Sequence, residues 1–278
     1  MATYVISDIH GEYGKFMELL DMIHFSDEDI LYVLGDVVDR GKNPVKTLLK
    51  MMEMPNVIPI AGNHEQMMLE CMSVLIKEVK DENSVKEFAE KFSDDMFQKL
   101  YAWQRNGGIA TTDELSKLDN ETRKDVLDYV ADFSWYEKVA VNGQKYLLVH
   151  GGLGNFDIKR DIDDYSLDEL VWSRVDYDVR YFDDVITVTG HTPTRYIEDN
   201  PRPGYVYRKN NHIDIDCGAY LPGGRLLILR QEDETRTIFT FFWTQEKNFI
   251  PVLMVDTDTD SYYRITDGGC WPLTEYGE

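Results

Sequence analysis

Cysteine is scarce in this chain of 278 residues, which has only Cys71, Cys217 and Cys270. Three widely spaced cysteines do not form the paired framework of a small disulfide-stabilised secreted domain. The chain goes straight into the strand-like run Ala2–Ile6 without a charged-then-apolar leader, and no apolar run approaches the length that spans a bilayer. These absences favour a reducing, cytoplasmic location and argue against a membrane partner.

Positive charge is also in short supply. The chain has 29 Lys and Arg against 51 Asp and Glu, a formal net charge of −22, and no lysine- or arginine-rich block. An acidic surface repels phosphate backbones, so nucleic acid and anionic membrane are disfavoured as non-specific partners. The composition is otherwise that of a globular protein, with 43% hydrophobic and 12% aromatic residues. We therefore expect most of the acidic residues on a solvated surface.

The first 64 residues alternate between strand-like and helix-like patterns. Strand-like runs occupy Tyr4–Ile6, Ile30–Leu34 and Val57–Ile60. Between them, apolar residues recur at helical spacing, first at Phe16, Leu19, Leu20 and Ile23 and then at Val45, Leu48, Leu49 and Met52. This order of strand, helix, strand, helix and strand predicts a parallel sheet with crossover helices. Pro59 indicates that the third strand lies at an edge or that the strand starts there.

The rest of the chain divides into a helical and a strand-rich part. From Glu65 to about Phe133 the pattern is helical, and Ser84–Glu87 and Thr111–Glu114 have the form of capping boxes. After Ser134 strand-like runs return, and the first two flank Asn142-Gly143, a strong hairpin signal. The sequence thus predicts a single α/β domain over residues 1–278, with a helical insertion at about 65–133 and an acidic, turn-rich peripheral tail at about 245–278.

Five apolar strands each end in a potential ligand next to a glycine. These ligands are Asp8, His10, Asp36, Asn63, His150 and His191. The carboxyl ends of strands in such sheets converge on one crevice. Nitrogen and oxygen ligands without thiolate suit Mn, Fe or Zn, and six are enough for two metals if one carboxylate bridges them. Taken singly, each has a plainer interpretation as a helix cap, a turn residue or a packed histidine, but the coincidence at five strand ends favours a metal site.

These motifs follow one another as they do in a known family. The chain carries Asp8-x-His10-Gly11, Gly35-Asp36-x-x-Asp39-Arg40-Gly41, Gly62-Asn63-His64-Glu65, His150-Gly151-Gly152 and Gly190-His191-Thr192-Pro193. In this it resembles the calcineurin-like metallophosphoesterases. Asp39-Arg40-Gly41 resembles the phosphoprotein phosphatase branch, and Trp103–Gly108 and Leu170–Arg174 resemble its bacterial and phage members of the lambda-phosphatase type. The resemblance covers about residues 1–230, with Ser7 standing where the family usually has glycine.

The resemblance implies a four-layer αββα sandwich and two divalent transition metals, manganese foremost, with iron or zinc as alternatives. In that arrangement Asp8 and His10 would hold metal one, Asn63, His150 and His191 would hold metal two, and Asp36 would bridge both together with an attacking water. His64 would be the general acid, paired with Asp39, while Arg40 and Arg174 would clamp the phosphate beside Asn63. Taken alone, Arg40 could instead form a salt bridge and Arg174 could be a surface residue.

Three functions stay open at this point. The first is a serine/threonine or dual-specificity protein phosphatase acting on a phosphoprotein or phosphopeptide. The second is a hydrolase of a small phosphorylated nucleotide, such as a dinucleoside tetraphosphatase, although those enzymes usually have another residue at the position of Asp39. The third is a metal-holding scaffold without turnover.

Two other features are expected to carry no function. The run Asp256–Asp267 starts like a calcium-binding loop but has Ser261 and Asp267 where such a loop needs glycine and glutamate, so a solvated acidic loop is the expectation. Cys217 has no evident base partner and is not expected to be a nucleophile.

Overall fold

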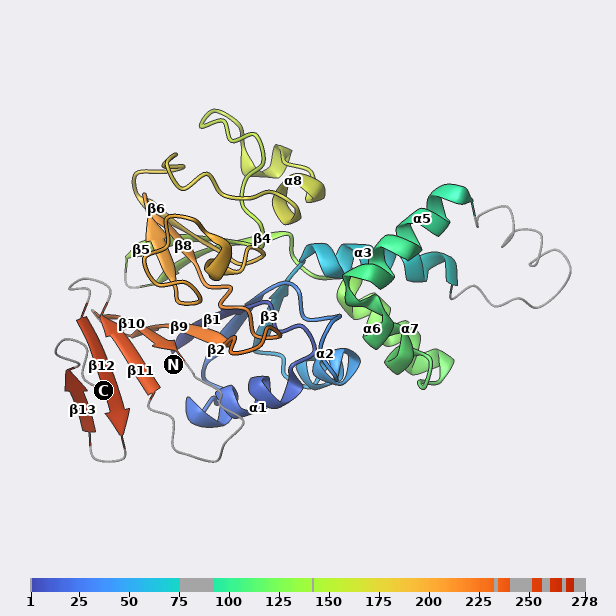
Figure 1. Ribbon diagram of the computed structural model, residues 1–278, viewed down its shortest axis with the longest axis horizontal. Helices are drawn as coiled ribbons and strands as arrows, with labels where there is room; N and C mark the ends of the chain where they lie inside the picture. The colour runs from blue at the N-terminus through green and yellow to red at the C-terminus, as the bar shows by residue number, and fades with distance from the viewer. Residues whose placement is uncertain are drawn as a thin grey trace, which may run out of the picture.

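Two mixed β-sheets face each other, with α1 (Tyr13–Met22) and α2 (Pro44–Met52) on the outer side of the first and the short α8 (Leu167–Val171) over the second (Figure 1). The computed structural model describes residues 2–75, 93–141, 143–232, 235–240, 252–256, 261–266 and 269–272. The first sheet has the order β13-β12-β11-β10-β9-β1-β2-β3 and the second β4-β5-β6-β8-β7. The strands of the first sheet are β1 (Thr3–Ser7), β2 (Ile30–Leu34), β3 (Val57–Ile60), β9 (Leu227–Glu232), β10 (Thr235–Thr240), β11 (Val252–Asp256), β12 (Ser261–Thr266) and β13 (Gly269–Pro272). Those of the second are β4 (Tyr136–Val141), β5 (Gln144–Val149), β6 (Val185–Thr189), β7 (Tyr207–Lys209) and β8 (His212–Asp214).

The helices fall into three groups along the chain. Two cross over between the first three strands, α1 (Tyr13–Met22) and α2 (Pro44–Met52). The insertion contains α3 (Asn63–Leu75), α5 (Asp94–Trp103), the π-turn Gln104–Gly108, α6 (Ile109–Leu115) and α7 (Asn120–Ala131), which lie together on one side of the sandwich (Figure 1). A short α8 (Leu167–Val171) lies over the outer face of the second sheet (Figure 1).

The strand order confirms the predicted parallel unit at the start of the chain. β1 pairs with β2 in parallel, and β2 pairs with β3 in parallel, with α1 and α2 as the crossovers. β3 is the edge strand, so Pro59, which lacks an N–H, removes no hydrogen bond to a further strand. The predicted hairpin is also present, since β4 and β5 are antiparallel neighbours and Val141 pairs with Gln144.

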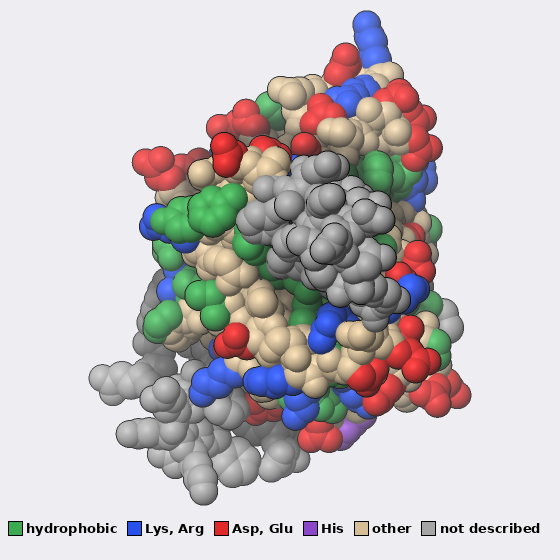
Figure 2. Space-filling view, turned by 90° about the vertical axis from the view of Figure 1, so that its right-hand side faces the viewer, with side chains coloured by type: hydrophobic (Ala, Val, Ile, Leu, Met, Phe, Trp, Pro, Cys, Tyr) green, Lys and Arg blue, Asp and Glu red, His purple; other side chains and the backbone are tan. Residues whose placement is uncertain are grey.

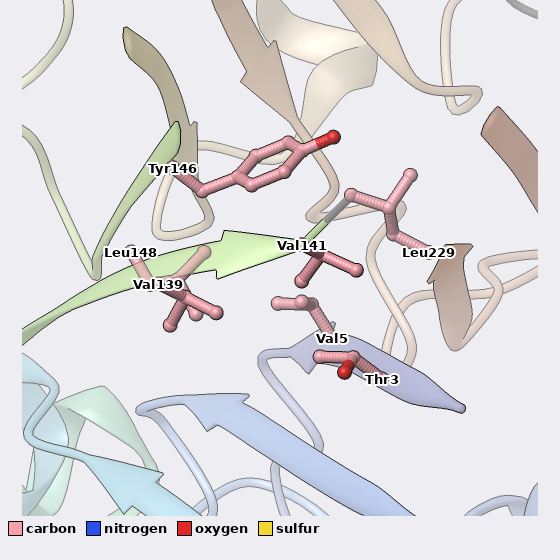
Figure 3. Close-up of a pocket in the computed structure, with 7 residues that line it drawn as sticks. All are labelled: Thr3, Val5, Val139, Val141, Tyr146, Leu148 and Leu229. Carbon is pink, nitrogen blue, oxygen red and sulfur yellow. The ribbon is translucent and has the colours of Figure 1, made fainter. Parts of the chain in front are cut away.

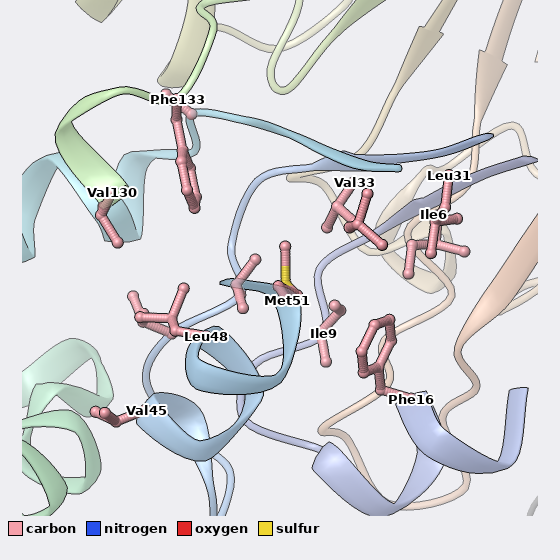
Figure 4. Packing of buried hydrophobic residues seen from close by; sticks show 14 of the residues in the cluster. Ile6, Ile9, Phe16, Leu31, Val33, Val45, Leu48, Met51, Val130 and Phe133 are labelled. Carbon is pink, nitrogen blue, oxygen red and sulfur yellow. The ribbon is translucent and has the colours of Figure 1, made fainter. Parts of the chain in front are cut away.

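The central strands are apolar on both faces because successive side chains point to opposite sides of the sheet and both sides are covered. Tyr4 and Ile6 of β1 point to the helices, while Val5 points to the second sheet. On the helical side, Phe16 of α1 lies near Ile6 of β1, and Leu48 of α2 belongs to the same cluster, near Val130 (Figure 4); Phe16 and Leu48 are fully buried. A fully buried side chain of this size contributes about 1.5–3 kcal/mol.

The space between the sheets is filled by the other faces of the same strands. Val5 of β1 lies opposite Val139 and Val141 of β4, with Leu148 of β5 beside them (Figure 3). A third cluster, which includes Leu147, Leu170 and Val171, packs between the second sheet and α8. The layers are therefore helices, sheet, sheet, and a thinner cover of α8 with its loops, so the predicted α/β sandwich is confirmed.

One capping prediction was wrong, and the actual partners are informative. Thr111 lies inside α6, whose N-cap is Gly108. The Glu114 carboxylate instead accepts the backbone N–H groups of Val45 at 2.8 Å and Lys46 at 3.2 Å, so it caps the start of α2. The sequence pattern could not show this, because the helix that needed a cap lies about 70 positions away in the chain. The other predicted box, Ser84–Glu87, lies outside the described residues.

The described parts of the C-terminal region form strands β11, β12 and β13, which extend the first sheet beyond β10 as antiparallel neighbours. The calcium-like run Asp256–Asp267 lies partly outside the described residues. On the face that carries the insertion, Asp and Glu side chains are spread over the visible surface (Figure 2). In the described part of the chain, none of the helices has the length and apolarity needed to cross a membrane.

Candidate active site

The predicted ligand residues lie together where the parallel strands of the two sheets end. Asp8 and His10 follow β1, Asp36 follows β2, Asn63 begins α3, and His150 and His191 follow β5 and β6. Backbone hydrogen bonds tie these loops to one another. The N–H of His10 donates to the carbonyl of Asp36 at 2.8 Å, and the N–H of Gly190 donates to the carbonyl of His150 at 2.9 Å.

The backbone of this region adopts conformations that ordinary residues avoid. Six side-chain-bearing residues have positive φ: Asp8 (46°), His10 (47°), Asp36 (53°), Asp39 (69°), Arg40 (65°) and His191 (69°). Each such residue costs about 1 kcal/mol or more relative to a relaxed backbone. Strain of this kind persists only where the surrounding contacts determine it, and it concentrates at functional sites. The inter-loop hydrogen bonds described above are those contacts.

Asp36 stands at the centre of the cluster, with its two oxygens facing different histidines. Its Oδ2 lies 3.5 Å from His10 Nε2, and its Oδ1 lies 3.4 Å from His150 Nε2. Two sets of potential ligand atoms, each within 4.8 Å, share this one carboxylate: His10, Asp36 and His64 form one, and Asp36, His150 and His191 form the other. Its position between the two sets is the one that a bridging ligand would take.

The histidine rings are oriented so that their lone pairs point inward. His10 Nδ1 lies 2.9 Å from the carbonyl of Val38, and His150 Nδ1 lies 2.7 Å from the carbonyl of Leu34. A carbonyl accepts only a donated proton, so these Nδ1 atoms carry the hydrogen and the Nε2 atoms carry lone pairs. Metal-binding histidines are commonly held by such a second hydrogen bond.

Asn63 completes the second set. Its Oδ1 lies 3.0 Å from His150 Nε2 and 2.9 Å from His191 Nδ1. The lone pair of His150 Nε2 thus faces an acceptor oxygen, an arrangement that a cation would stabilise. Donor atoms that each bind one ion at about 2.0–2.2 Å lie about 3 Å apart. The side chains present here therefore fit a divalent cation between Asn63, His150 and His191.

The protonation states favour the ligand forms of these side chains. Burial holds the pKa of His10 well below its usual range and lowers that of His150. Burial and the neighbouring His150 lower the pKa of His191 to about 3. Burial alone would raise the pKa of Asp36, but the surrounding histidines, His150 foremost, hold it below its usual value. Neutral histidines around an ionised carboxylate are what a transition metal binds.

Asp8 lies at the border of this arrangement. Its carboxylate accepts the backbone N–H of His191 through both oxygens, at 3.2 and 3.1 Å. It is not in either set of converging ligand atoms, where His64 stands beside His10 and Asp36 instead. Burial, and then the charges of Asp216 and Asp36, raise the pKa of Asp8 well above its usual range. A cation beside these carboxylates would relieve their mutual repulsion.

A buried pair lies next to the cluster. His64 Nδ1 donates to Asp39 Oδ2 at 2.6 Å, and the two side chains are 1% and 0% exposed. Burial by itself would lower the pKa of His64, but the charge of Asp36 and the hydrogen bond to Asp39 raise it above its usual value. The protein therefore holds, beside Asp36, an imidazole whose environment favours its protonated form.

The two predicted phosphate ligands occupy different environments. Arg40 points into the cluster, where its Nη1 donates to His10 Nε2 and its Nη2 lies next to His64 Nε2, both at 2.9 Å. Its guanidinium lies 4.3 Å from the centre of the Tyr220 ring. Arg174 lies on the side of the second sheet, exposed, with Nη1 donating to Thr192 Oγ1 at 3.2 Å. Arg40 thus contacts a predicted ligand, His10, and Arg174 contacts the residue that follows the predicted ligand His191.

Sequence reasoning did not place in this site three residues that contact it. Glu65 accepts four backbone N–H groups from the loops that carry Asp36 and Asn63. Trp103 and Thr111 reach Asp39 from the helical insertion. Glu65 could have been suspected from its position directly after Asn63-His64. Trp103 could have been suspected from the run Trp103–Gly108, which resembles the family although the sequence gives no physical reason for it.

Comparison with known proteins agrees with the geometry. The family described as calcineurin-like phosphoesterase matches residues 1–219. A serine/threonine-protein phosphatase 2 from Salmonella typhimurium is 28% identical over 174 residues, 62% of this chain and 67% of the relative. A symmetrical bis(5'-nucleosyl)-tetraphosphatase from Wigglesworthia glossinidia brevipalpis is 32% identical over 120 residues, 42% of this chain.

The matched segment spans 43% of that tetraphosphatase, less than half of its length. Among solved structures, that of a proposed diadenosine tetraphosphatase has a TM-score of 0.58 with 15% identity and covers 88% of this chain and 95% of its own. At that identity the structural likeness speaks for the fold alone. The relatives therefore carry names of both substrate classes that the sequence left open.

Proposed function

The chain belongs to the calcineurin-like phosphoesterase family, and from this we propose that it is a metal-dependent phosphomonoester hydrolase that acts on phosphoserine and phosphothreonine in proteins. The observation that carries the proposal is the buried Asp39–His64 pair, at 2.6 Å, directly beside the Asp36 carboxylate. An alkoxide leaving group from serine is a strong base and needs a proton as it departs. An imidazole that favours its protonated form can supply that proton.

The proposal uses two divalent transition metal ions, manganese foremost, with iron or zinc as alternatives. Asp8 and His10 would hold one, Asn63, His150 and His191 would hold the other, and Asp36, which is common to both sets of convergent ligand atoms, would contribute to each. When bound, such ions provide a nucleophile from water at neutral pH and neutralise phosphate charge. The loops that carry these ligands are tied together by the backbone hydrogen bonds of the cluster, which orients the ligands before any ion binds.

The chain's own side chains then bind and orient the phosphate. Arg40 and Arg174 present planar N–H forks that match phosphate oxygens, which a lysine would not. Arg40 is supported from behind by the Tyr220 ring and reaches Nε2 of His64, so the phosphate clamp and the proton donor face the same point. Asn63 lies between the two histidines of the second set, with its Oδ1 within 3.0 Å of both rings, where it would contact a bound phosphate.

His64→Asn tests the acid role. We expect retained metal content and a fall in kcat that is much larger for phenyl phosphate or a phosphoserine peptide than for p-nitrophenyl phosphate, whose leaving group needs no proton. Measurement of kcat on these substrates, with metal content by mass spectrometry, checks it. Equal losses on good and poor leaving groups would count against His64 as the acid.

A second function is supported by the relatives that are named symmetrical tetraphosphatases. Under that alternative the substrate is a dinucleoside polyphosphate. Side-by-side measurement of kcat/KM on phosphoserine peptides and diadenosine tetraphosphate, with added Mn, distinguishes the two. The proposal predicts the higher value for the peptides, and a higher value for the nucleotide would replace it. Turnover of neither, by protein with its metals bound, would leave only the metal-holding scaffold.

A further inference from the structure

The helical insertion reaches into the site through Asp39. The carboxylate of Asp39 is fully buried, and each of its oxygens accepts a donor from the insertion. Trp103 Nε1 donates to Oδ2 at 2.8 Å, from the last residue of α5. Thr111 Oγ1, on α6, donates to Oδ1 at 2.5 Å and accepts the backbone N–H of Asp39 at 2.9 Å. His64 Nδ1 is the third side-chain donor, at 2.6 Å on Oδ2.

The π-turn between these two residues is shaped around the same loop. Gly107, at φ 108°, accepts the backbone N–H of Arg40 at 3.1 Å. A Cβ at Gly108 would lie 2.7 Å from the indole of Trp103, so the ring packs directly on that backbone. The sequence Trp103–Gly108 therefore holds the indole and the Asp39-Arg40 backbone in one fixed arrangement.

These contacts matter because of how a carboxylate rotates. The final torsion of an aspartate side chain is broad and roughly two-fold, so the chain of Asp39 alone does not fix where its oxygens point. Donors on both oxygens, from Trp103 on one side and Thr111 on the other, remove that freedom. Oδ2 then stays directed at His64 Nδ1, and the ring is held with Nε2 toward Arg40 and Asp36.

We propose that Trp103 and Thr111 are positioning residues for the proton donor, acting on His64 through Asp39, so that the helical insertion is part of the catalytic apparatus. The inference rests on the proposed function of His64 and deepens it. Among the described residues, the side-chain hydrogen bonds of Trp103 and Thr111 at the site go to Asp39 and not to the predicted metal ligands. Their effect is therefore on the orientation of His64 and not on metal binding.

Trp103→Phe and Thr111→Val test the proposal, since each keeps most of the buried volume and removes a donor to the Asp39 carboxylate. Thr111→Val also removes the hydroxyl that accepts the backbone N–H of Asp39. We expect kcat on phenyl phosphate to fall roughly tenfold or more in each, the factor that corresponds to one lost hydrogen bond to a charged group. KM and metal content should stay unchanged, and kcat on p-nitrophenyl phosphate should change far less. Thr111→Ser, which keeps the hydroxyl, should restore most of the activity.

Matched substitutions control for the loss of a similar group elsewhere. Thr47 is equally buried, but its hydroxyl donates at 2.8 Å to the carbonyl of Asn43, the N-cap residue of α2, so Thr47→Val should leave the ratio of kcat on the two substrates unchanged. Trp135 is 49% exposed, and Trp135→Phe should do the same.

The decisive measurement is Trp103→Phe in the His64→Asn background. Groups that act through one another are non-additive, so we expect no further loss of kcat there. A further loss of the same size, lost metal, or equal losses on both substrates would overturn the positioning role. If His64→Asn itself fails to distinguish good from poor leaving groups, the proposed acid role falls and takes this inference with it. If His64→Asn distinguishes them but Trp103→Phe does not, only the inference falls.

Discussion

Glu65→Gln offers a sharp test of how the site is held together. Oε2 of Glu65 accepts the backbone N–H groups of Asp36 at 2.8 Å and Gly62 at 2.9 Å, and Oε1 accepts those of Val37 at 2.8 Å and Val38 at 3.2 Å. One buried carboxylate thus ties the end of β2 to the end of β3. A glutamine has only one acceptor oxygen, so the NH₂ group at the other position must face two backbone N–H donors, from which it cannot accept.

The expected cost follows from that count. Two hydrogen bonds to a charged group are lost, and two buried N–H groups are left without an acceptor, which together amount to about 3–5 kcal/mol. Burial and the charge of Asp36 raise the pKa of Glu65 to about 7, so the measurement belongs at about pH 8, where the carboxylate is ionised. Urea unfolding of the metal-free protein should show this loss as a lower midpoint with an unchanged slope.

Glu114→Gln is the matched control. Both of its strong hydrogen bonds, from Val45 and Lys46, end on Oε2, so a glutamine oxygen at that position keeps both. Only the 3.4 Å contact from Asn43 Nδ2 to Oε1 is lost, and the expected cost is below about 1 kcal/mol. Equal costs for the two substitutions, or a Glu65→Gln cost below about 1 kcal/mol, would refute the reasoning.

Three further predictions test other parts of the account. Asp36→Asn should lose metal and activity together, and a variant that keeps its full metal content by mass spectrometry would contradict the bridging role. Gly107→Ala places a Cβ 2.6 Å from Arg40 Cγ, so the inhibition constant for phosphate should rise, whereas Gly143→Ala, also at positive φ (81°) but with nothing within 4 Å, should leave it unchanged. His212 is buried, and burial lowers its pKa in the folded protein. As pH falls below about 6.5, the imidazole is therefore protonated in the unfolded state before it is protonated in the folded state, and the free energy of unfolding should decrease. His212→Phe should make that fall shallower by up to about 1.4 kcal/mol per pH unit in urea titrations with chelator, and an unchanged slope would contradict the assignment.

The sequence could predict those parts of the fold that depend on patterns of neighbouring residues. The runs Tyr4–Ile6 and Ile30–Leu34 are apolar at every position because both faces of these strands are covered, one by helices and one by the second sheet. A glycine and a polar residue directly after such a run indicate a strand end at the crevice, which is why Asp36 and His150 could be named in advance as candidates.

The parts that sequence could not predict depend on contacts between distant segments. Thr111 looked like a local helix cap, but its hydroxyl bonds Asp39, which is 72 positions away. Trp103 stood out in the sequence only through the resemblance of the run Trp103–Gly108, yet its N–H has a buried acceptor. Nothing in local spacing distinguishes these uses from the ordinary ones, because the partner is chosen by how the insertion packs on the loop after β2.

The central claim is that Asp36 is shared by two cations, and anomalous diffraction from crystals of the manganese-loaded protein tests it most directly. The account predicts two peaks, one on each side of the Asp36 carboxylate, with His10 beside one and Asn63, His150 and His191 around the other. A single peak, or peaks remote from Asp36, in crystals of active enzyme would contradict it.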